Sequence, residues 1–171
     1  HTFFYPLEDY HPAILDRLAG LRERGLGDVE VHLHHQGDTS QGLAQRLLEF
    51  AATLHTRHGL LRVDPATGRP TYGFIHGNWA LDNSLPGGAW CGVNDELRVL
   101  SQTGCYADFT LPAYPSPAQT RTINSIYYAT DDPLRPKSHD RGRPAAVGRP
   151  PSGDLLLVQG VLALDWRRRK G

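Results

Sequence analysis

The stretch that decides the fold, "VEVHLHHQGDTSQGLAQRLLEF", runs from Val29 to Phe50 and joins a strand-like segment to a helix-like one. In its first half apolar and polar side chains alternate, which is the period of a β-strand with one polar face. In its second half apolar residues recur at helical spacing, beginning with Leu43 and Leu47. The stretch therefore predicts a strand followed directly by an amphipathic helix.

The same order of elements continues on both sides of this stretch. A β-prone run, "TFFY", precedes a predicted helix over residues 9–24, and "TYGFIH" over residues 71–76 predicts a further strand. A Gly- and Asn-rich loop then leads to a predicted helix over 95–103 and a strand from residue 105. Such alternation predicts parallel strands with right-handed crossover helices, either as a doubly wound sheet or as part of a (β/α) barrel. Functional sites in both folds lie at the C-terminal ends of the strands.

With 171 residues the chain has the length of a single domain, 1–171. Residues 1–110 carry the regular βα units, whereas residues 111–171 are rich in loops and end in an apolar run that predicts a strand or a hairpin. The chain starts at His1 inside a strand-like run, which predicts that it is an incomplete piece of a longer protein.

Charge and hydropathy exclude several classes of partner. The 18 basic and 18 acidic residues balance, so we expect no nucleic-acid partner. No run approaches the ~18 apolar residues that a membrane-spanning helix needs. The first residues lack the basic and apolar regions of a signal peptide, which slightly favours a cytoplasmic location. Cys91 and Cys105 are too few for a zinc ribbon or a disulfide framework.

The histidines after Val31 suggest a metal site. His32 and His34 would share the polar face of their strand near its C-terminal end, and Asp38 would lie on the following loop or first helical turn. Neutral imidazoles and a carboxylate suit zinc, and also iron, cobalt or nickel. His35 would point to the opposite face, which weakens its case as a ligand. In the alternative interpretation the imidazoles bond to loops and Asp38 only caps the helix.

Several strings resemble, in order, the polysaccharide deacetylase family, carbohydrate esterase family 4. "HTFFYP", "PAILDRLAGLRERGLG" and "EVHLH" are similar to the "TFF" strand, the helix and the strand ending "EIGNH" of that family. "GFIHGNWALDNSLPGGAWCGVNDELRVLSQTGCYADFT" resembles the arginine-proline loop, helix and strand that follow. The resemblance covers roughly residues 1–110. It implies a (β/α) barrel-like fold, partial or distorted, and removal of acetyl groups from N-acetylated sugars with a divalent metal.

The resemblance also implies roles for individual residues. It places His34 on the family's first metal histidine and Asp38 on the second, so that the family's HxxxH reads HxxxD, with His32 as a further ligand and zinc as the expected metal. The family's paired aspartates, which supply a ligand and the general base, would lie upstream of His1. Where the family has its arginine and proline, this chain has "IHG", so His76 or Asn78 would orient the substrate.

"KSHDRG" resembles the late histidine that protonates the leaving amine, which makes His139 the expected acid, with Asp140 orienting it. Trp79 and Tyr114 are predicted to stack on sugar rings, although aromatic residues in loops also serve for packing. The first hypothesis is therefore a metal-dependent carbohydrate deacetylase. The alternatives are a non-catalytic carbohydrate-binding or scaffold domain and a metal-dependent phosphoesterase, which also uses an HxH motif after a strand.

Overall fold

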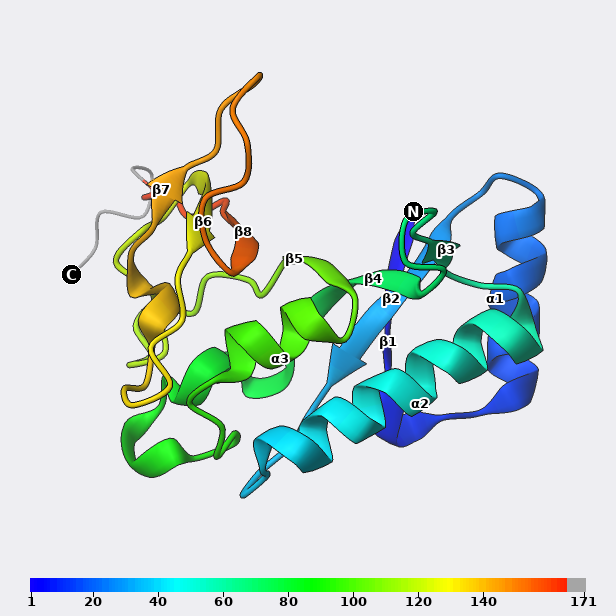
Figure 1. Ribbon diagram of the computed structural model, residues 1–171, viewed down its shortest axis with the longest axis horizontal. Helices are drawn as coiled ribbons and strands as arrows, with labels where there is room; N and C mark the ends of the chain where they lie inside the picture. Colours follow the sequence, from blue (N-terminus) through cyan, green and yellow to red (C-terminus); the bar gives the residue numbers. More distant parts are fainter. Residues whose placement is uncertain (166–171) are drawn as a thin grey trace.

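A computed structural model describes residues 1–165 of the chain, which form a mixed α/β fold (Figure 1). The strands are β1 (Thr2–Pro6), β2 (Asp28–Leu33), β3 (Arg62–Val63), β4 (Pro70–His76), β5 (Cys105–Asp108), β6 (Ser125–Ala129), β7 (Arg143–Pro144) and β8 (Leu155–Gln159). The α-helices are α1 (Pro12–Glu23), α2 (Ser40–His58) and α3 (Glu96–Gln102). Short 3-10 turns are η1 (Leu7–Asp9), η2 (Gly77–Trp79), η3 (Leu81–Asn83), η4 (Pro86–Gly88) and η5 (Ser138–Asp140).

The strands form one eight-stranded, mostly parallel sheet in the order β1-β2-β4-β5-β8-β6-β7, with β3 paired to β4. Four neighbouring pairs, from β1-β2 through β5-β8, are parallel, whereas β6 is antiparallel to both β8 and β7. The α-helices connect successive parallel strands, as the alternation in the sequence predicts. The terminal strand predicted after residue 153 is β8, and residues 166–171 lie outside the part of the chain that the structure describes.

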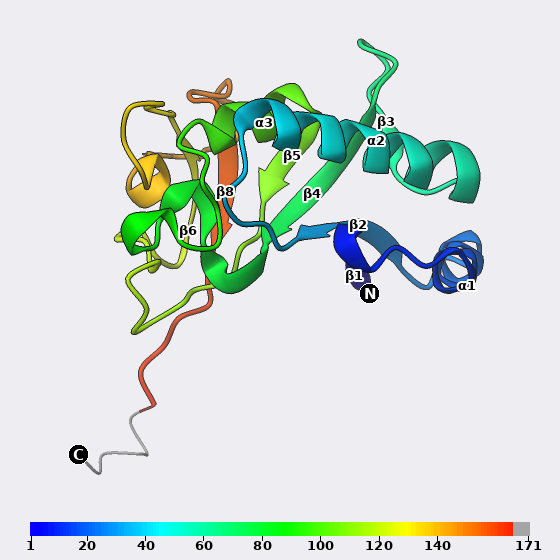
Figure 2. The same cartoon turned by 90° about the horizontal axis from the view of Figure 1, so that it is seen from below.

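The core lies between the sheet and the helices. Val29, Val31 and Leu33 of β2 are buried, while the polar residues between them are only half-buried, so the predicted alternation is confirmed. Leu43 and Leu47 of α2 are fully buried against this face. Figure 2 shows α2 and α3 together along one side of the sheet. None of the helices in residues 1–165 combines the length and apolar character needed to cross a membrane.

The helix α2 begins and ends at defined signals. At its N-terminus the Thr39 hydroxyl accepts a hydrogen bond from the backbone N–H of Gly42 at 3.1 Å. At its C-terminus Gly59 takes the left-handed conformation with φ of 64°, and its N–H donates to the carbonyl of His55. The N-cap fixes where the helix starts, and thereby fixes the short loop between β2 and α2.

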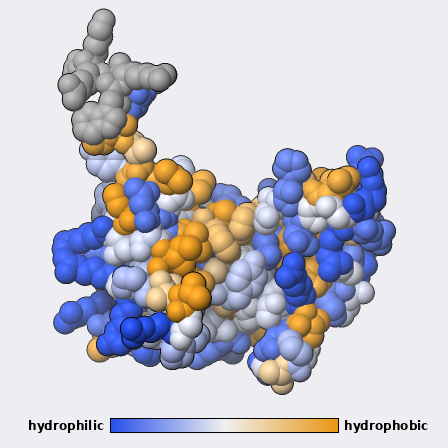
Figure 3. Space-filling view, turned by 90° about the horizontal axis from the view of Figure 1, so that it is seen from above, coloured by the Kyte–Doolittle hydropathy of each residue, from blue (hydrophilic) through white to orange (hydrophobic). Residues whose placement is uncertain are grey.

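The side of the sheet that faces away from α2 carries a cavity of about 570 Å³. Phe4, Glu30, Tyr106 and Phe109 contribute to its lining, and the Tyr106 hydroxyl donates to Glu30 at 2.8 Å. In the surface view of Figure 3, hydrophobic side chains gather near the middle of the face shown, and hydrophilic ones lie toward both ends of the molecule. The two sides of the sheet therefore differ: one is a packed core and the other is open.

Candidate metal centre

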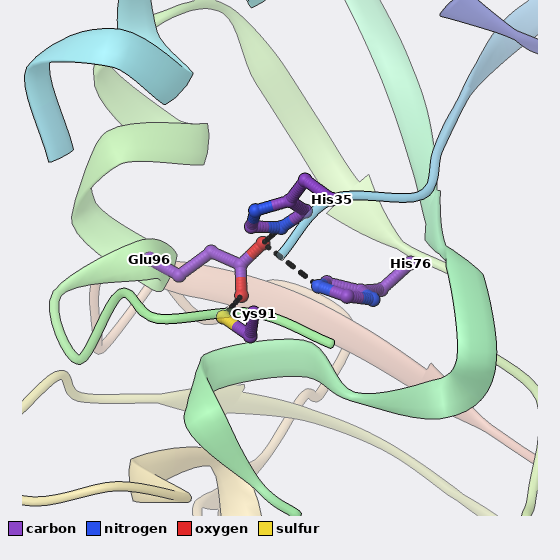
Figure 4. Close-up of side chains that lie close together, drawn as sticks. All are labelled: His35, His76, Cys91 and Glu96. Atoms are coloured by element: carbon purple, nitrogen blue, oxygen red, sulfur yellow. Dashed lines mark hydrogen bonds and ion pairs between the residues drawn. The ribbon is translucent and has the colours of Figure 1, made fainter. Parts of the chain in front are cut away.

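Four buried side chains from separate segments meet at one point: His35, His76, Cys91 and Glu96 (Figure 4). One ligand-type atom of each, a ring nitrogen, the thiol sulfur or a carboxylate oxygen, lies within 4.8 Å of the others. We call these four residues the HHCE cluster. The cluster could hold a metal ion.

The sheet and helix α3 bring the cluster together. His76 is the last residue of β4, and the parallel register pairs it with Leu33, the last residue of β2. His35 follows Leu33 by two positions and so continues the buried side of the alternation. Glu96 is the first residue of α3, and Cys91 lies in the loop before it. The cluster thus lies at the C-terminal ends of parallel strands, where α/β proteins place their sites.

Glu96 is the centre of the cluster. Its Oε1 lies 3.2 Å from His35 Nε2 and 3.5 Å from His76 Nε2, while its Oε2 lies 3.3 Å from the sulfur of Cys91. In a tetrahedral zinc site with bonds of 2.0–2.3 Å, adjacent ligand atoms are roughly 3.3–3.8 Å apart. The three contacts of Glu96 are close to these values, and the four ligand atoms lie within 4.8 Å of one another, so the cluster could hold a metal ion.

The protonation states of Glu96 and His76 suit a cation, whereas burial raises the pKa of the Cys91 thiol, which a metal would have to deprotonate. Burial raises the pKa of the Glu96 carboxyl, but the facing imidazoles of His76 and His35 and the N–H of Asp82 outweigh burial and lower it to about 2. Burial lowers the pKa of His76 to about 4 against the opposing charge of Glu96. At neutral pH the cluster therefore offers a carboxylate and a neutral imidazole, the forms that bind divalent metals.

The second ring nitrogens of the histidines face oxygen atoms outside the cluster. His76 Nδ1 faces the carbonyl of Gly77, which directs Nε2 toward Glu96. His35 Nδ1 lies 3.4 Å from a carboxylate oxygen of Asp38, at ion-pair distance, and makes no hydrogen bond within residues 1–165. Carboxylate or carbonyl partners of this kind orient metal-binding histidines. Within residues 1–165, His76 Nε2 is buried without a hydrogen-bond partner, as a vacant ligand atom would be.

A buried acid–base pair lies directly beside the cluster. The backbone N–H of Asp82 donates to Glu96 Oε2 at 2.6 Å, and its carboxylate lies 3.6 Å from His139 Nδ1. Asp82 and His139 are both buried, and burial raises the pKa of the Asp82 carboxyl. The residue beside the His139 ring is therefore Asp82 and not Asp140, whose carboxylate instead pairs with Arg121 at 3.2 Å. The expectation that Asp140 orients His139 is corrected accordingly.

A third buried carboxylate connects to the cluster through one hydroxyl. Thr110 Oγ1 accepts from the backbone N–H of His76 at 2.9 Å and donates to Asp108 at 2.7 Å. Asp108 is completely buried at the end of β5, and burial raises its pKa to about 7. The edge of the sheet thus carries a connected group of buried polar side chains.

The predicted ligands His32, His34 and Asp38 are not members of the HHCE cluster. His32 and His34 do share one face, with ring centroids 4.5 Å apart, but His32 Nδ1 bonds to the carbonyl of Ile75 and His34 pairs with Glu8. This face is opposite to the one that α3 covers, because β-strand side chains alternate. Asp38 pairs with Arg46 and faces His35. The structure therefore brings together His35 and His76, and not the HxxxD pair.

The predicted substrate residues lie in loops. Trp79 is 49% exposed and lines a small cavity together with His139. Asn78 lies next to it in η2, in the left-handed region with φ of 56°. Tyr114 is 75% exposed. Trp79 is thus the aromatic residue near the cluster's acid–base pair, and Tyr114 is an outlying surface residue.

Three members of the cluster were missed by inspection of the sequence. In the sequence His35 points away from His32 and His34, which argues against it as their co-ligand. Cys91 stands out only as one of two cysteines, and Glu96 only as a position inside a predicted helix. The usable signal was His35 itself, since it continues the buried positions 29, 31 and 33, and a histidine on the core side of a strand end needs a polar partner.

Comparison with known proteins adds no relative: no model of a protein family, no curated protein and no solved structure matches this chain. The resemblance to polysaccharide deacetylases therefore stays a prediction.

Proposed function

We propose that this protein is a zinc-dependent hydrolase that removes acetyl groups from N-acetylated sugars, with its metal in the HHCE cluster. The observation that carries the proposal is the meeting of two imidazoles, a thiol and a carboxylate, all buried, at the C-terminal edge of parallel strands. A divalent metal bound there would polarise a carbonyl oxygen and lower the pKa of a bound water toward ~7.

The donor set favours zinc among the common metals. Magnesium and calcium prefer oxygen ligands, whereas the cluster offers nitrogen and sulfur beside a single carboxylate. Imidazole, thiolate and carboxylate are the three ligand types of protein zinc sites. Iron, cobalt and nickel share part of this preference, so metal content has to be measured directly.

The acid–base pair beside the cluster supports hydrolysis. His139 and Asp82 are buried together, and Asp82 also donates its N–H to Glu96. A histidine oriented by a carboxylate can give a proton to a leaving amine, the role that the resemblance implies for His139. Asp82 would hold the ring, and Trp79, which is 49% exposed beside His139, would offer an aromatic face to a sugar at the surface.

The topology supports the barrel-like part of the proposal. β1, β2, β4 and β5 are adjacent in the order in which they occur in the chain, and all run parallel. Consecutive parallel strands joined by helices are the building pattern of (β/α) barrels, to which the resemblance also points. We therefore propose a partial or distorted barrel arrangement with the HHCE cluster at its catalytic end.

A second candidate function is a non-catalytic carbohydrate-binding or scaffold domain whose metal only stabilises the fold. One observation favours it: the cluster offers four protein ligands and is buried. Structural zinc sites have four protein ligands, whereas catalytic sites keep one position open. The experiment has to separate these two roles of one metal site.

The test combines metal content with acetate release. Purified protein is expected to contain about one zinc per chain and to release acetate from N-acetylated sugar oligomers; a chelator removes this activity and zinc restores it. Glu96→Gln should lose both metal and activity, because it replaces the central carboxylate. The matched control Glu8→Gln, which alters the carboxylate beside His34, should keep both.

Two results would contradict the proposal. Loss of zinc from Glu8→Gln but not from Glu96→Gln would show that the metal binds on the side of the sheet where His34 lies. Zinc bound at the HHCE cluster with sugar binding but no acetate release would favour the second candidate function.

A further inference from the structure

The four ligand groups of the HHCE cluster are not held equally firmly. His76 and Glu96 belong to β4 and α3, and His35 is held against Asp38. Cys91 lies in a loop, outside any strand or helix. Its neighbour Gly92 has φ of 105°, in the region that favours glycine. Cys91 and His35 both lie outside strands and helices, but the ring of His35 also faces Asp38, so Cys91 is the ligand held by fewer side chains.

Cys91 also differs from the histidines in having other partners. Its sulfur accepts from the backbone N–H groups of Asn83 and Val93, each at 3.4 Å, and lies 3.5 Å from the carbonyl of Val93. A buried polar atom that loses its partner costs free energy, and one that keeps other partners costs less. His76 Nε2 has no hydrogen-bond partner within residues 1–165, so the cost of detaching it from a metal is higher.

Movement of the sulfur does not require movement of the loop. The carbonyl of Cys91 accepts a hydrogen bond from the N–H of Asp38 at 3.0 Å, which ties the backbone to the start of α2. The cysteine side chain has one rotatable bond before the sulfur. A small rotation about that bond would lengthen the distance from the sulfur to Glu96 and keep the sulfur near the N–H groups of Asn83 and Val93.

The number of ligands gives this movement a consequence. With Cys91 bound, the site has four protein ligands and is closed. Without it, two histidines and a glutamate remain, a set that catalytic zinc sites use with an open position. The same cluster can thus be closed or open, depending on one side chain.

We infer that Cys91 is an exchangeable ligand, whose sulfur closes the metal site at rest and leaves it when an oxygen ligand arrives. The inference rests on the proposed function and concerns regulation of the same site. With a metal bound, the bond from the Cys91 sulfur would break, an incoming oxygen ligand would take the vacated position, and the proton released by an incoming acid would pass to the thiolate of Cys91. No atom is oxidised or reduced.

Cobalt-substituted protein and acetohydroxamate, a small hydroxamic acid that binds metals through oxygen, provide the test. Wild-type protein loaded with cobalt should show a thiolate-to-cobalt charge-transfer band in the near ultraviolet. Addition of acetohydroxamate should remove that band while cobalt remains bound, as measured by elemental analysis after gel filtration. Cys91→Ser should lack the band from the start and still bind cobalt through the three remaining ligands, more weakly than wild type.

The second cysteine supplies a matched control. Cys105 is also buried and free but is not in the cluster, so Cys105→Ser should keep both the band and its loss with acetohydroxamate. The inference is overturned if wild-type protein has no band, if acetohydroxamate does not bind, or if it binds calorimetrically while the band persists. If acetohydroxamate removed the band but the protein released no acetate from N-acetylated sugars, the proposed function would be contradicted. The inference that Cys91 is an exchangeable ligand would still be supported.

Discussion

Two neighbouring histidines, His34 and His35, lie in opposite environments. The side chain of His34 is 46% exposed and pairs with Glu8, whereas that of His35 is 1% exposed and pairs with Glu96. They are the same residue type at consecutive positions, and only His35 belongs to a group that could hold a metal. The side of the sheet on which a histidine lies therefore decides whether its imidazole can become a ligand. The number of histidines close together in the sequence matters less.

The physical reason is the period of the strand. A step of one residue moves a side chain to the other side of a sheet. On one side, α3 brings the carboxylate of Glu96 to the strand ends; on the other lies the open face with Glu30 and Tyr106. The motif HxH selects two histidines on one face, and here that face is the one without Glu96.

The largest expected effect is on metal binding. His35→Ala removes a nitrogen ligand from the HHCE cluster, and we expect zinc affinity to fall by well over ~100-fold, more than for loss of an outer partner. His34→Ala should leave it unchanged, because His34 lies outside the cluster. Competition titration with a zinc-binding dye measures both variants. If the two variants lost zinc affinity equally, or if only His34→Ala lost it, the metal site would not be confined to the side of the sheet that carries His35.

The next effect concerns Asp108, a buried carboxyl that should make the free energy of unfolding depend on pH. Burial raises the pKa of Asp108 to about 7, above its ordinary value near 3.9. Between about pH 4 and 7 the unfolded chain has released this proton and the folded chain retains it, so stability falls as pH rises. The contribution amounts to up to about 4 kcal/mol.

Asp108→Asn mimics the protonated form: its amide oxygen can accept from the backbone N–H of Thr110, and its NH2 group can donate to Thr110 Oγ1, which then accepts in place of donating. The variant should equal wild type near pH 4 and be more stable at pH 8, by up to about 4 kcal/mol in urea unfolding of the metal-free protein. Glu30→Gln is the control from the open face: burial also raises its pKa, but partial solvent contact makes the gain smaller. A gain from Asp108→Asn that is independent of pH would contradict this account.

Much of the fold could be predicted from the sequence because local signals and tertiary structure agree there. The alternation from Val29 to Leu33 specifies one outcome, and the structure has it. Asp38, Thr39 and Ser40 could each cap the helix that follows, and only the structure selects Thr39. Parallel pairing of β1, β2, β4 and β5 follows from the alternation of strands and helices. The antiparallel attachment of β6 and β7 was not predicted, because short strands among prolines carry little periodic signal.

The site could be predicted only in part, because its members come from four distant segments. The sequence favours the C-terminal ends of the strands, where the HHCE cluster lies, and points to His76, although for another role. Cys91 and Glu96 carry no local mark of a site: one lies in a glycine-rich loop and the other begins a helix, where acidic residues are common. Their relation to His35 depends on strand register and on the position of α3.

A smaller effect on metal binding is expected from Asp38, which faces His35 Nδ1 at 3.4 Å. Asp38→Asn keeps the size of the side chain but removes the charge that orients the imidazole, so zinc affinity should fall by about 10-fold. The dye titration used for His35 measures this as well. A loss as large as that of His35→Ala would mean that Asp38 is itself a ligand, as HxxxD implies, and an unchanged affinity would remove it from the site.

The smallest expected effect separates Asp38 from its neighbour Thr39. Thr39 accepts the hydrogen bond from Gly42 that caps α2, so Thr39→Ala should lower the free energy of unfolding by about 1 kcal/mol. Zinc affinity should not change, because the backbone N–H of Asp38 remains bonded to Cys91 and still fixes the loop. Urea unfolding measures the free energy of unfolding, and the dye titration measures the zinc affinity. If Thr39→Ala weakened zinc binding more than Asp38→Asn, the cap would be positioning His35, and the orienting role would pass from the carboxylate of Asp38 to the start of the helix.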